Sequence, residues 1–132
     1  FSPKEVKTWR KSYDYQPKPI DEKNKLWSGL DDRYKEIDKN KIPKGESLKE
    51  TVFRVSHFWN EFICPNIKDN KKIIISAHGN SIRALLMYIE NITPQDIEEV
   101  NIPRATPILL RFDDQNKFIS REFLYTTSDI EN

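Results

Sequence analysis

The stretch Lys71–Glu90, KKIIISAHGNSIRALLMYIE, constrains the fold of this 132-residue chain more than any other. Its apolar run Ile73–Ala77 starts with β-branched residues and does not alternate with polar ones, which is typical of a strand buried on both faces in a parallel sheet. From Ser81 to Glu90, apolar residues recur at helical spacing. We therefore predict a buried strand and a helix, joined by a turn at residues 78–81.

That turn brings His78, Gly79 and Asn80 to one point of the chain. In open α/β sheets, ligands bind at the carboxyl ends of the strands. A helix N-terminus adds free N–H groups and the positive end of a dipole, which favour an anion, and glycine allows a ligand to approach the backbone closely. The three residues are therefore a candidate site for a phosphate-sized anion. A plain structural turn stays open as the alternative, because His-Gly pairs also occur in turns without function.

Composition narrows the class of protein. Charged residues make up 33% of the chain and leave a net charge of +1, which argues against a dedicated nucleic-acid binder. Cys64 is the only cysteine, so no intrachain disulfide can form and a reducing compartment is the simpler assumption. No apolar run approaches the length of a membrane span. The chain starts at Phe1 instead of Met, from which we expect further sequence upstream.

The N-terminal residues predict a short helix with basic residues at its end. Ser2–Pro3 supplies an N-cap and a first helical residue, and the helix should end near Ser12. The overlapping stretch Trp9–Asp14 places Arg10 and Lys11 between aromatic residues. It can be interpreted as a clamp for a phosphate or carboxylate, or as a surface helix end whose cations answer the helix dipole. From these residues alone the surface helix end is favoured.

A longer helix is predicted at Glu46–Lys68, with Ser47 as its cap. Its apolar residues follow spacings of four and three, which indicates one buried stripe. The stripe consists of Leu48, Val52, Val55, Trp59 and Phe62. Pro65 should stop or kink the helix near its end. His57 lies off the stripe among polar neighbours, and we assign it no role.

The remaining segments are predicted as a loop, a short helix and a hairpin. Tyr15–Lys44 is long and contains several prolines, and we interpret residues 15–45 as an ordered flap-like loop. Thr93–Asp96 has the capping pattern of a fresh helix start. Near the C-terminus, Ile108–Phe112 and Phe118–Leu124 are expected to be paired strands around a polar turn.

Several motifs then occur together in one order. They are Trp-Arg-Lys-Ser-Tyr-Asp at 9–14, Asp32-Arg33-Tyr34, Glu46-Ser47-Leu48-Lys49, Phe58-Trp59-Asn60-Glu61, Ser76-Ala77-His78-Gly79-Asn80-Ser81 with Arg83-Ala84-Leu85, and Asn101-Ile102-Pro103 before Pro107. This set resembles the C-terminal part of the cofactor-dependent phosphoglycerate mutases of the histidine phosphatase superfamily. The resemblance runs from about Phe1 to about Leu124.

The resemblance implies a fold and an activity. The fold would be α/β, a three-layer doubly wound sandwich with a mostly parallel sheet, and residues 1–132 would be the C-terminal part of that single domain. The reaction would interconvert 2-phosphoglycerate and 3-phosphoglycerate, in glycolysis and gluconeogenesis, through a phosphorylated histidine. The cofactor would be 2,3-bisphosphoglycerate, which primes that histidine, with no metal. The partners would be small phosphorylated three-carbon acids, with no nucleic acid and no membrane, in a cytoplasmic homo-oligomer, a dimer or tetramer.

The resemblance also implies roles for individual residues. His78 would lie beside the phosphorylated histidine and steady the transferring phosphoryl group. Gly79 and Asn80 would contribute to substrate binding. Arg10 and Lys11 would bind the carboxylate or phosphate of the substrate, so the resemblance favours the clamp over the plain helix end.

Three departures from the family pattern qualify these expectations. The Arg-His-Gly motif with the phosphorylated histidine, and the Asn-Glu-Arg motif with the acid-base glutamate, do not occur in this sequence. We expect both upstream of Phe1, so the segment alone should not complete a catalytic cycle. Lys11 replaces the usual Arg and loses its planar fork. Arg104-Ala105 replaces the usual Thr-Gly, which could narrow that wall of the site and alter substrate preference.

Two alternatives remain open at this point. Bisphosphoglycerate mutase and bisphosphoglycerate phosphatase activities use the same residues, and this half of the pattern does not rank them. The chain could also be a truncated, non-catalytic relative that binds phosphorylated acids or a protein partner, which the missing Arg-His-Gly motif suggests.

Overall fold

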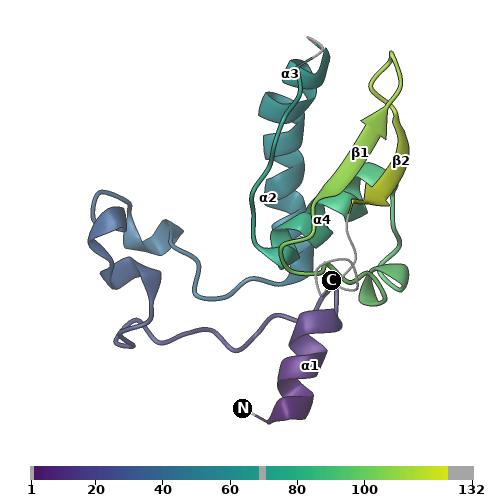
Figure 1. The fold of residues 1–132 in the computed structure, drawn as a ribbon. Helices are drawn as coiled ribbons and strands as arrows, with labels where there is room; N and C mark the ends of the chain where they lie inside the picture. The colour runs from purple at the N-terminus through teal and green to yellow at the C-terminus, as the bar shows by residue number, and fades with distance from the viewer. Residues whose placement is uncertain (1, 69–70, 125–132) are drawn as a thin grey trace.

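A computed structural model describes residues 2–68 and 71–124, apart from the side chain of Arg10. A helical pair, α2 and α4, forms the centre, with α1 at one end, a hairpin at one side and a long loop at the other (Figure 1). The elements are α1 (Pro3–Lys11), η1 (Ser28–Leu30), η2 (Asp32–Tyr34), η3 (Lys39–Lys41), α2 (Leu48–Phe58), η4 (Trp59–Ile63), α3 (Cys64–Lys68), α4 (Gly79–Glu90), η5 (Asp96–Glu98), β1 (Ile108–Phe112) and β2 (Phe118–Phe123). Within the described ranges, no helix is both long and apolar enough to cross a bilayer.

The core lies between α2 and α4. One buried cluster joins Leu48 of α2 to Ala84 and Met87 of α4 and to Ile97 of η5. The other joins η4 to the middle of α4 and consists of Trp59, Ile63 and Leu85. Phe112 of β1 packs on the Trp59 ring, with centroids 5.6 Å apart. The hairpin thus closes the second cluster, and α4 is held on both sides.

The long predicted helix is present but contains a register change. It runs from Leu48 to Lys68 through α2, the π-helical turn η4 and α3. A π-turn adds one residue to the helical repeat, so the apolar stripe moves on by one position: Ile63 is buried, whereas Phe62 is 57% exposed. The prediction that Phe62 belongs to the buried stripe was therefore wrong. Pro65 does not stop the helix, which continues to Lys68 directly after the π-turn.

The predicted strand at Ile73–Ala77 is not formed. These residues are neither helical nor paired in a sheet, and Ile74 is 96% exposed. The physical reason is that a strand is stable only when neighbouring strands accept its backbone hydrogen bonds. The described strands, β1 and β2, pair with each other and leave this segment without a neighbour.

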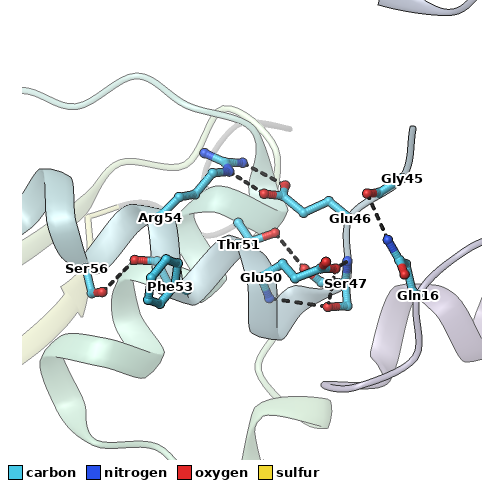
Figure 2. Close-up of polar contacts among 9 residues, drawn as sticks. All are labelled: Gln16, Gly45, Glu46, Ser47, Glu50, Thr51, Phe53, Arg54 and Ser56. Atoms are coloured by element: carbon cyan, nitrogen blue, oxygen red, sulfur yellow. Dashed lines mark hydrogen bonds and ion pairs between the residues drawn. The ribbon is translucent and has the colours of Figure 1, made fainter. Parts of the chain in front are cut away.

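Caps fix where the helices begin. Ser2 accepts a hydrogen bond from Glu5 N–H, and Pro3 is the first residue of α1, as predicted. Ser47 and Glu50 form the same reciprocal capping box at α2, shown in Figure 2. In this view Arg54 also makes an ion pair with Glu46, which directly precedes the N-cap Ser47. These caps satisfy N–H groups that a helix start otherwise leaves without partners.

Residues 15–45 form an irregular loop with three 3₁₀ turns that extends away from the helices in Figure 1. Its interior is built around Trp27, which is 3% exposed. The Trp27 ring lies over Gly29, where an added Cβ would come within 2.3 Å of a ring carbon. The two ends of the loop are joined by hydrogen bonds from Ile20 N to Lys44 O, 2.8 Å, and from Gln16 Nε2 to Gly45 O, 3.0 Å.

The C-terminal hairpin matches the prediction to within one residue. Strand β1 pairs antiparallel with β2, and Ile108 lies opposite Phe123. Before it, where a short helix was predicted, the single 3₁₀ turn η5 has Gln95 at its N-cap position, and Thr93 Oγ1 accepts a hydrogen bond from Asp96 N–H at 3.2 Å. This two-stranded sheet neither confirms nor contradicts a three-layer sandwich, which stays a prediction.

Candidate active site

His78 is the N-cap of α4 and does not lie on a separate turn. Its backbone is extended, and α4 begins at Gly79, two residues before the predicted start. The Nδ1 atom of His78 accepts a hydrogen bond from the backbone N–H of Asn80 at 3.3 Å. In a neutral imidazole the other ring nitrogen then carries the proton. Nε2 is therefore the nitrogen that can donate a hydrogen bond to a ligand at this helix end.

Gly79 leaves open space next to the start of α4. Its φ is not in the left-handed region, and an added Cβ would meet no described atom within 4 Å. Neither local conformation nor packing among the described residues therefore requires a glycine here. A ligand could approach this backbone closely, which agrees with the reason for selecting Gly79 from the sequence.

The other basic segment is anchored to the body of the molecule just after α1 ends. Lys11 is the last residue of α1 and its side chain is exposed. Two residues later, Tyr13 packs against the first core cluster, and its carbonyl accepts a hydrogen bond from Lys49 N at 3.0 Å. The backbone of Arg10 belongs to α1, whereas its side chain lies outside the described atoms. The candidate clamp, Arg10 and Lys11, is thus attached to the core through Tyr13.

These two segments meet at one cavity of about 1190 Å³. His78, Gly79 and Asn80 line it from α4, and Lys11 lines it from α1. The structure therefore brings together four of the five site residues predicted from the sequence. The exposed His57 is not among its lining residues. The cavity exceeds the roughly 300–1,000 Å³ of typical small-molecule sites, so a small acid would not fill it.

Charges of both signs surround this cavity. Lys7 and Arg104 add two cations to Lys11, while Glu98 and Glu99 add two carboxylates. The cations and the helix N-terminus favour an anion. No set of three or more potential metal ligands occurs among the residues that the structure covers.

Comparison with known proteins decides the family. The model of the histidine phosphatase superfamily (branch 1) matches residues 13–123. The chain belongs to this superfamily. The predicted resemblance is therefore confirmed at the level of the family, and with it the α/β class of the fold.

Individual relatives are similar over nearly the whole chain. The 2,3-bisphosphoglycerate-dependent phosphoglycerate mutase of Buchnera aphidicola subsp. Acyrthosiphon pisum (strain 5A) is 44% identical over 124 residues, which are 94% of this chain and 54% of that protein. The protein of the same name from Lachnoclostridium phytofermentans is 39% identical, over 94% of this chain and 50% of that protein. The chain thus spans about half the length of the curated relatives it matches.

One wall of the cavity in this histidine phosphatase superfamily member carries backbone strain. Ala105 has a φ of 55°, in the left-handed region, where the Cβ crowds the backbone and glycine is favoured. It follows Arg104, whose carbonyl accepts a hydrogen bond from Thr106 Oγ1 at 3.3 Å. An Ala at this position is thus less favourable than a Gly for the backbone conformation. From the sequence we expected only a narrower wall of the site here.

Sequence analysis assigned no role to Arg83, which lines both the large cavity and a smaller one beside it. Arg83 is buried, and its guanidinium donates to two backbone carbonyls, those of Ile97 and Lys11. Burial lowers the pKa of Arg83 from its ordinary value, and the carboxylate of Glu98 raises it in part. The side chain stays charged at any physiological pH. Its partners lie 14 and 72 residues away, so no local pattern could have revealed this arrangement.

Proposed function

We propose that this chain is the C-terminal part of a 2,3-bisphosphoglycerate-dependent phosphoglycerate mutase, which interconverts 2-phosphoglycerate and 3-phosphoglycerate. The observation that carries the proposal is the shared cavity, where His78 and the start of α4 meet Lys11 at the end of α1. A substrate with a phosphate at one end and a carboxylate at the other suits two anion-binding walls. The names of the 39–44% identical relatives agree with this substrate.

The proposed chemistry is phosphoryl transfer through a phosphohistidine that lies outside this chain. The P–N bond of that phosphohistidine breaks as the substrate hydroxyl oxygen bonds to phosphorus, and the hydroxyl proton passes to an acid-base glutamate outside this chain. Catalysis of such a transfer depends mainly on positioning and on charge stabilisation. His78 would donate from Nε2 to an equatorial phosphoryl oxygen, because Nδ1 already accepts from Asn80 N–H. Gly79 and Asn80 would hold the same phosphoryl group at the helix N-terminus.

The basic wall would bind the other end of the substrate. Lys11 and Arg10 would attract the carboxylate or the phosphate that does not react. Arg104 and Lys7 line the same cavity and add positive charge. Because Lys11 is a point charge without a planar fork, it would attract an anion but orient it less strictly than an Arg.

The residues present fit 2,3-bisphosphoglycerate. The cations on the cavity and the N–H groups at the start of α4 match its two phosphates and carboxylate. Of the two opposing carboxylates, Glu98 lies near Arg83, which offsets part of its charge. When bound, this cofactor supplies the phosphoryl group that primes the phosphohistidine. The residues of this chain would hold it by the same contacts as the substrate.

The fold proposal follows from the exposed apolar run. In a three-layer doubly wound sandwich, Ile73–Ala77 would be a strand of a mostly parallel sheet. β-branched residues in a row are typical of strands buried on both faces, whereas this run is exposed among the described residues. This contrast supports the proposal that the run is buried in a larger sheet. An apolar groove of about 550 Å³ between this run and the helices, lined by Ile73, Phe58 and Leu85 among others, offers further surface for burial. Residues 15–45 would act as a flap over the substrate. The full-length protein would be a homo-oligomer in the cytoplasm.

The experiment that tests the function compares two histidines in the full-length protein. We predict that His78→Asn lowers kcat for 3-phosphoglycerate by roughly 10²-fold or more, the effect of removing one preorganised donor to a developing charge. Asn is a good N-cap, so α4 should still begin at residue 79 and the protein should stay folded. The matched control is His57→Asn, since His57 is exposed and contacts Phe53 away from the cavity. A His78→Asn variant with an undiminished rate would exclude the proposed role.

A non-catalytic role is the second candidate, since the Arg-His-Gly motif does not occur in this sequence. In that case the chain would bind phosphorylated acids without turnover. Isothermal titration of the 132-residue chain with 2,3-bisphosphoglycerate tests this candidate. Binding by the chain, together with no mutase activity of the full-length protein, would favour it, whereas an active full-length enzyme would exclude it.

A further inference from the structure

Arg83 links the two walls of the cavity through backbone hydrogen bonds. It lies on α4, five residues after His78, and its side chain is 7% exposed. One guanidinium nitrogen, Nη2, donates to Ile97 O at 2.6 Å and approaches Lys11 O at 3.4 Å. The Ile97 residue is fully buried in the first core cluster. Arg83 is therefore held firmly on one side and reaches the end of α1 on the other.

The end of α1 borders two cavities in the part of the chain that the structure describes. The large cavity lies along one side, lined by Lys7 and Lys11 of α1. A second cavity of about 230 Å³, lined by Val6 and Trp9 of α1, lies between α1, α2 and α4, and Arg83 lines both cavities. Empty space next to a helix removes dispersion contacts that would otherwise hold it. The last carbonyls of a helix also lack intrahelical partners and attract a cation.

We infer that Arg83 is a positioning residue, which holds the basic clamp of α1 at a fixed distance from His78. The inference rests on the proposed function, since it assigns Arg83 to the site of phosphoryl transfer without contact to substrate. Because α4 carries both His78 and Arg83, one rigid helix sets the place of the phosphoryl end and, through Lys11 O, the place of the opposite end. A loss of Arg83 therefore moves the clamp while leaving His78 in place.

This geometry predicts a specific kinetic effect in the full-length protein. Arg83→Lys keeps the positive charge, but its ammonium lies on a shorter side chain than the Nη2 atom that makes both contacts, so it should reach the two carbonyls less well. We expect about a tenfold higher KM for 3-phosphoglycerate with a change in kcat below about threefold, because misplacing a substrate-positioning group by 1 Å can cost up to two orders of magnitude. The matched control is Arg111→Lys, since Arg111 pairs with Glu122 on the exposed hairpin.

A double-mutant cycle separates positioning from general stability. If Arg83 acts through the clamp, Arg83→Lys should raise KM by less than about twofold in a Lys11→Met background, since coupled residues are not additive. If Arg83 only stabilises the fold, Arg83→Lys should lower the melting temperature, and it should change KM by the same factor in the unsubstituted and the Lys11→Met backgrounds. An unchanged KM in folded Arg83→Lys, or a full tenfold increase in both backgrounds, would overturn the inference.

Failure of the proposed function is visible in the unsubstituted protein. If that protein does not interconvert phosphoglycerates, the proposed activity is wrong whatever Arg83 does. The inference is then measured by isothermal titration with 2,3-bisphosphoglycerate, where Arg83→Lys should raise the Kd about tenfold and Arg111→Lys should not. Equal Kd values for the unsubstituted protein and Arg83→Lys would overturn the inference independently.

Discussion

At the scale of single residues, one side chain carries both structure and proposed chemistry. His78 uses Nδ1 to accept Asn80 N–H at 3.3 Å, which caps α4, and this leaves Nε2 for a ligand. The sequence could identify His78 as a candidate, because it lies between an apolar run and a helix. The cap could not be predicted, since histidine is not among the residues that usually cap helices.

Arg83 marks the limit of sequence reasoning at this scale. It belongs to a recognisable motif, but a motif does not reveal a hydrogen bond to a carbonyl 72 residues away. The strained φ of Ala105 is similar. The sequence showed that an Ala stands where the family usually has Gly, whereas the left-handed conformation that makes this costly depends on the turn itself.

A pH titration tests the residue contacts of the flap-like loop. Hydrogen bonds from the side chain of Arg33, and then from its backbone N–H, lower the pKa of Asp31 from 3.8 to about 2. Since the folded value lies below the ordinary one, the contact stabilises the folded loop above about pH 3.8 and is lost as the pH falls through about 2.

We therefore expect the Asp31 carboxyl to titrate near pH 2 in an NMR experiment. In an Arg33→Gln variant, the midpoint should rise toward 3.8. A midpoint already near 3.8 in the unsubstituted chain would show that the Asp31–Arg33 pair does not form.

At the scale of elements, the caps and the hairpin followed from local chemistry, whereas the π-turn did not. Ser47 and Glu50 are three residues apart, so a capping box was readable from the sequence. The turn η4 shifts the buried position from Phe62 to Ile63. That choice depends on how α2 packs against α4 and β1, and the apolar spacing allowed either residue to face the core.

The α2 cap predicts a measurable stability effect. Ser47→Ala removes the side-chain acceptor for Glu50 N–H and should cost about 1 kcal/mol of unfolding free energy. The matched control is Ser56→Ala on the same helix, where the hydroxyl only donates to Phe53 O (Figure 2). It should cost less than about 0.5 kcal/mol. Urea unfolding of the full-length protein measures both, and equal costs would argue against the capping role.

At the scale of the whole molecule, family membership was predictable and the sheet was not. The ordered motifs carried the histidine phosphatase resemblance, and the family match over residues 13–123 confirmed it. Ile73–Ala77 was predicted as a strand, but a strand exists only with neighbours, and the described strands pair with each other. The chain spans about half the length of the curated relatives it matches. Among the described residues, no strand lies beside Ile73–Ala77 with which it could form a parallel sheet.

The most direct test of the proposed function is the position of the phosphohistidine. The full-length protein would be incubated with 2,3-bisphosphoglycerate, digested at alkaline pH and mapped by mass spectrometry. We predict a phosphohistidine outside residues 1–132, because the proposal assigns His78 as a donor to the phosphoryl group and because His57 does not line the cavity. Phosphate on His78 or His57, or no phosphohistidine at all, would contradict the proposal that this chain supplies one half of a phosphoglycerate mutase site.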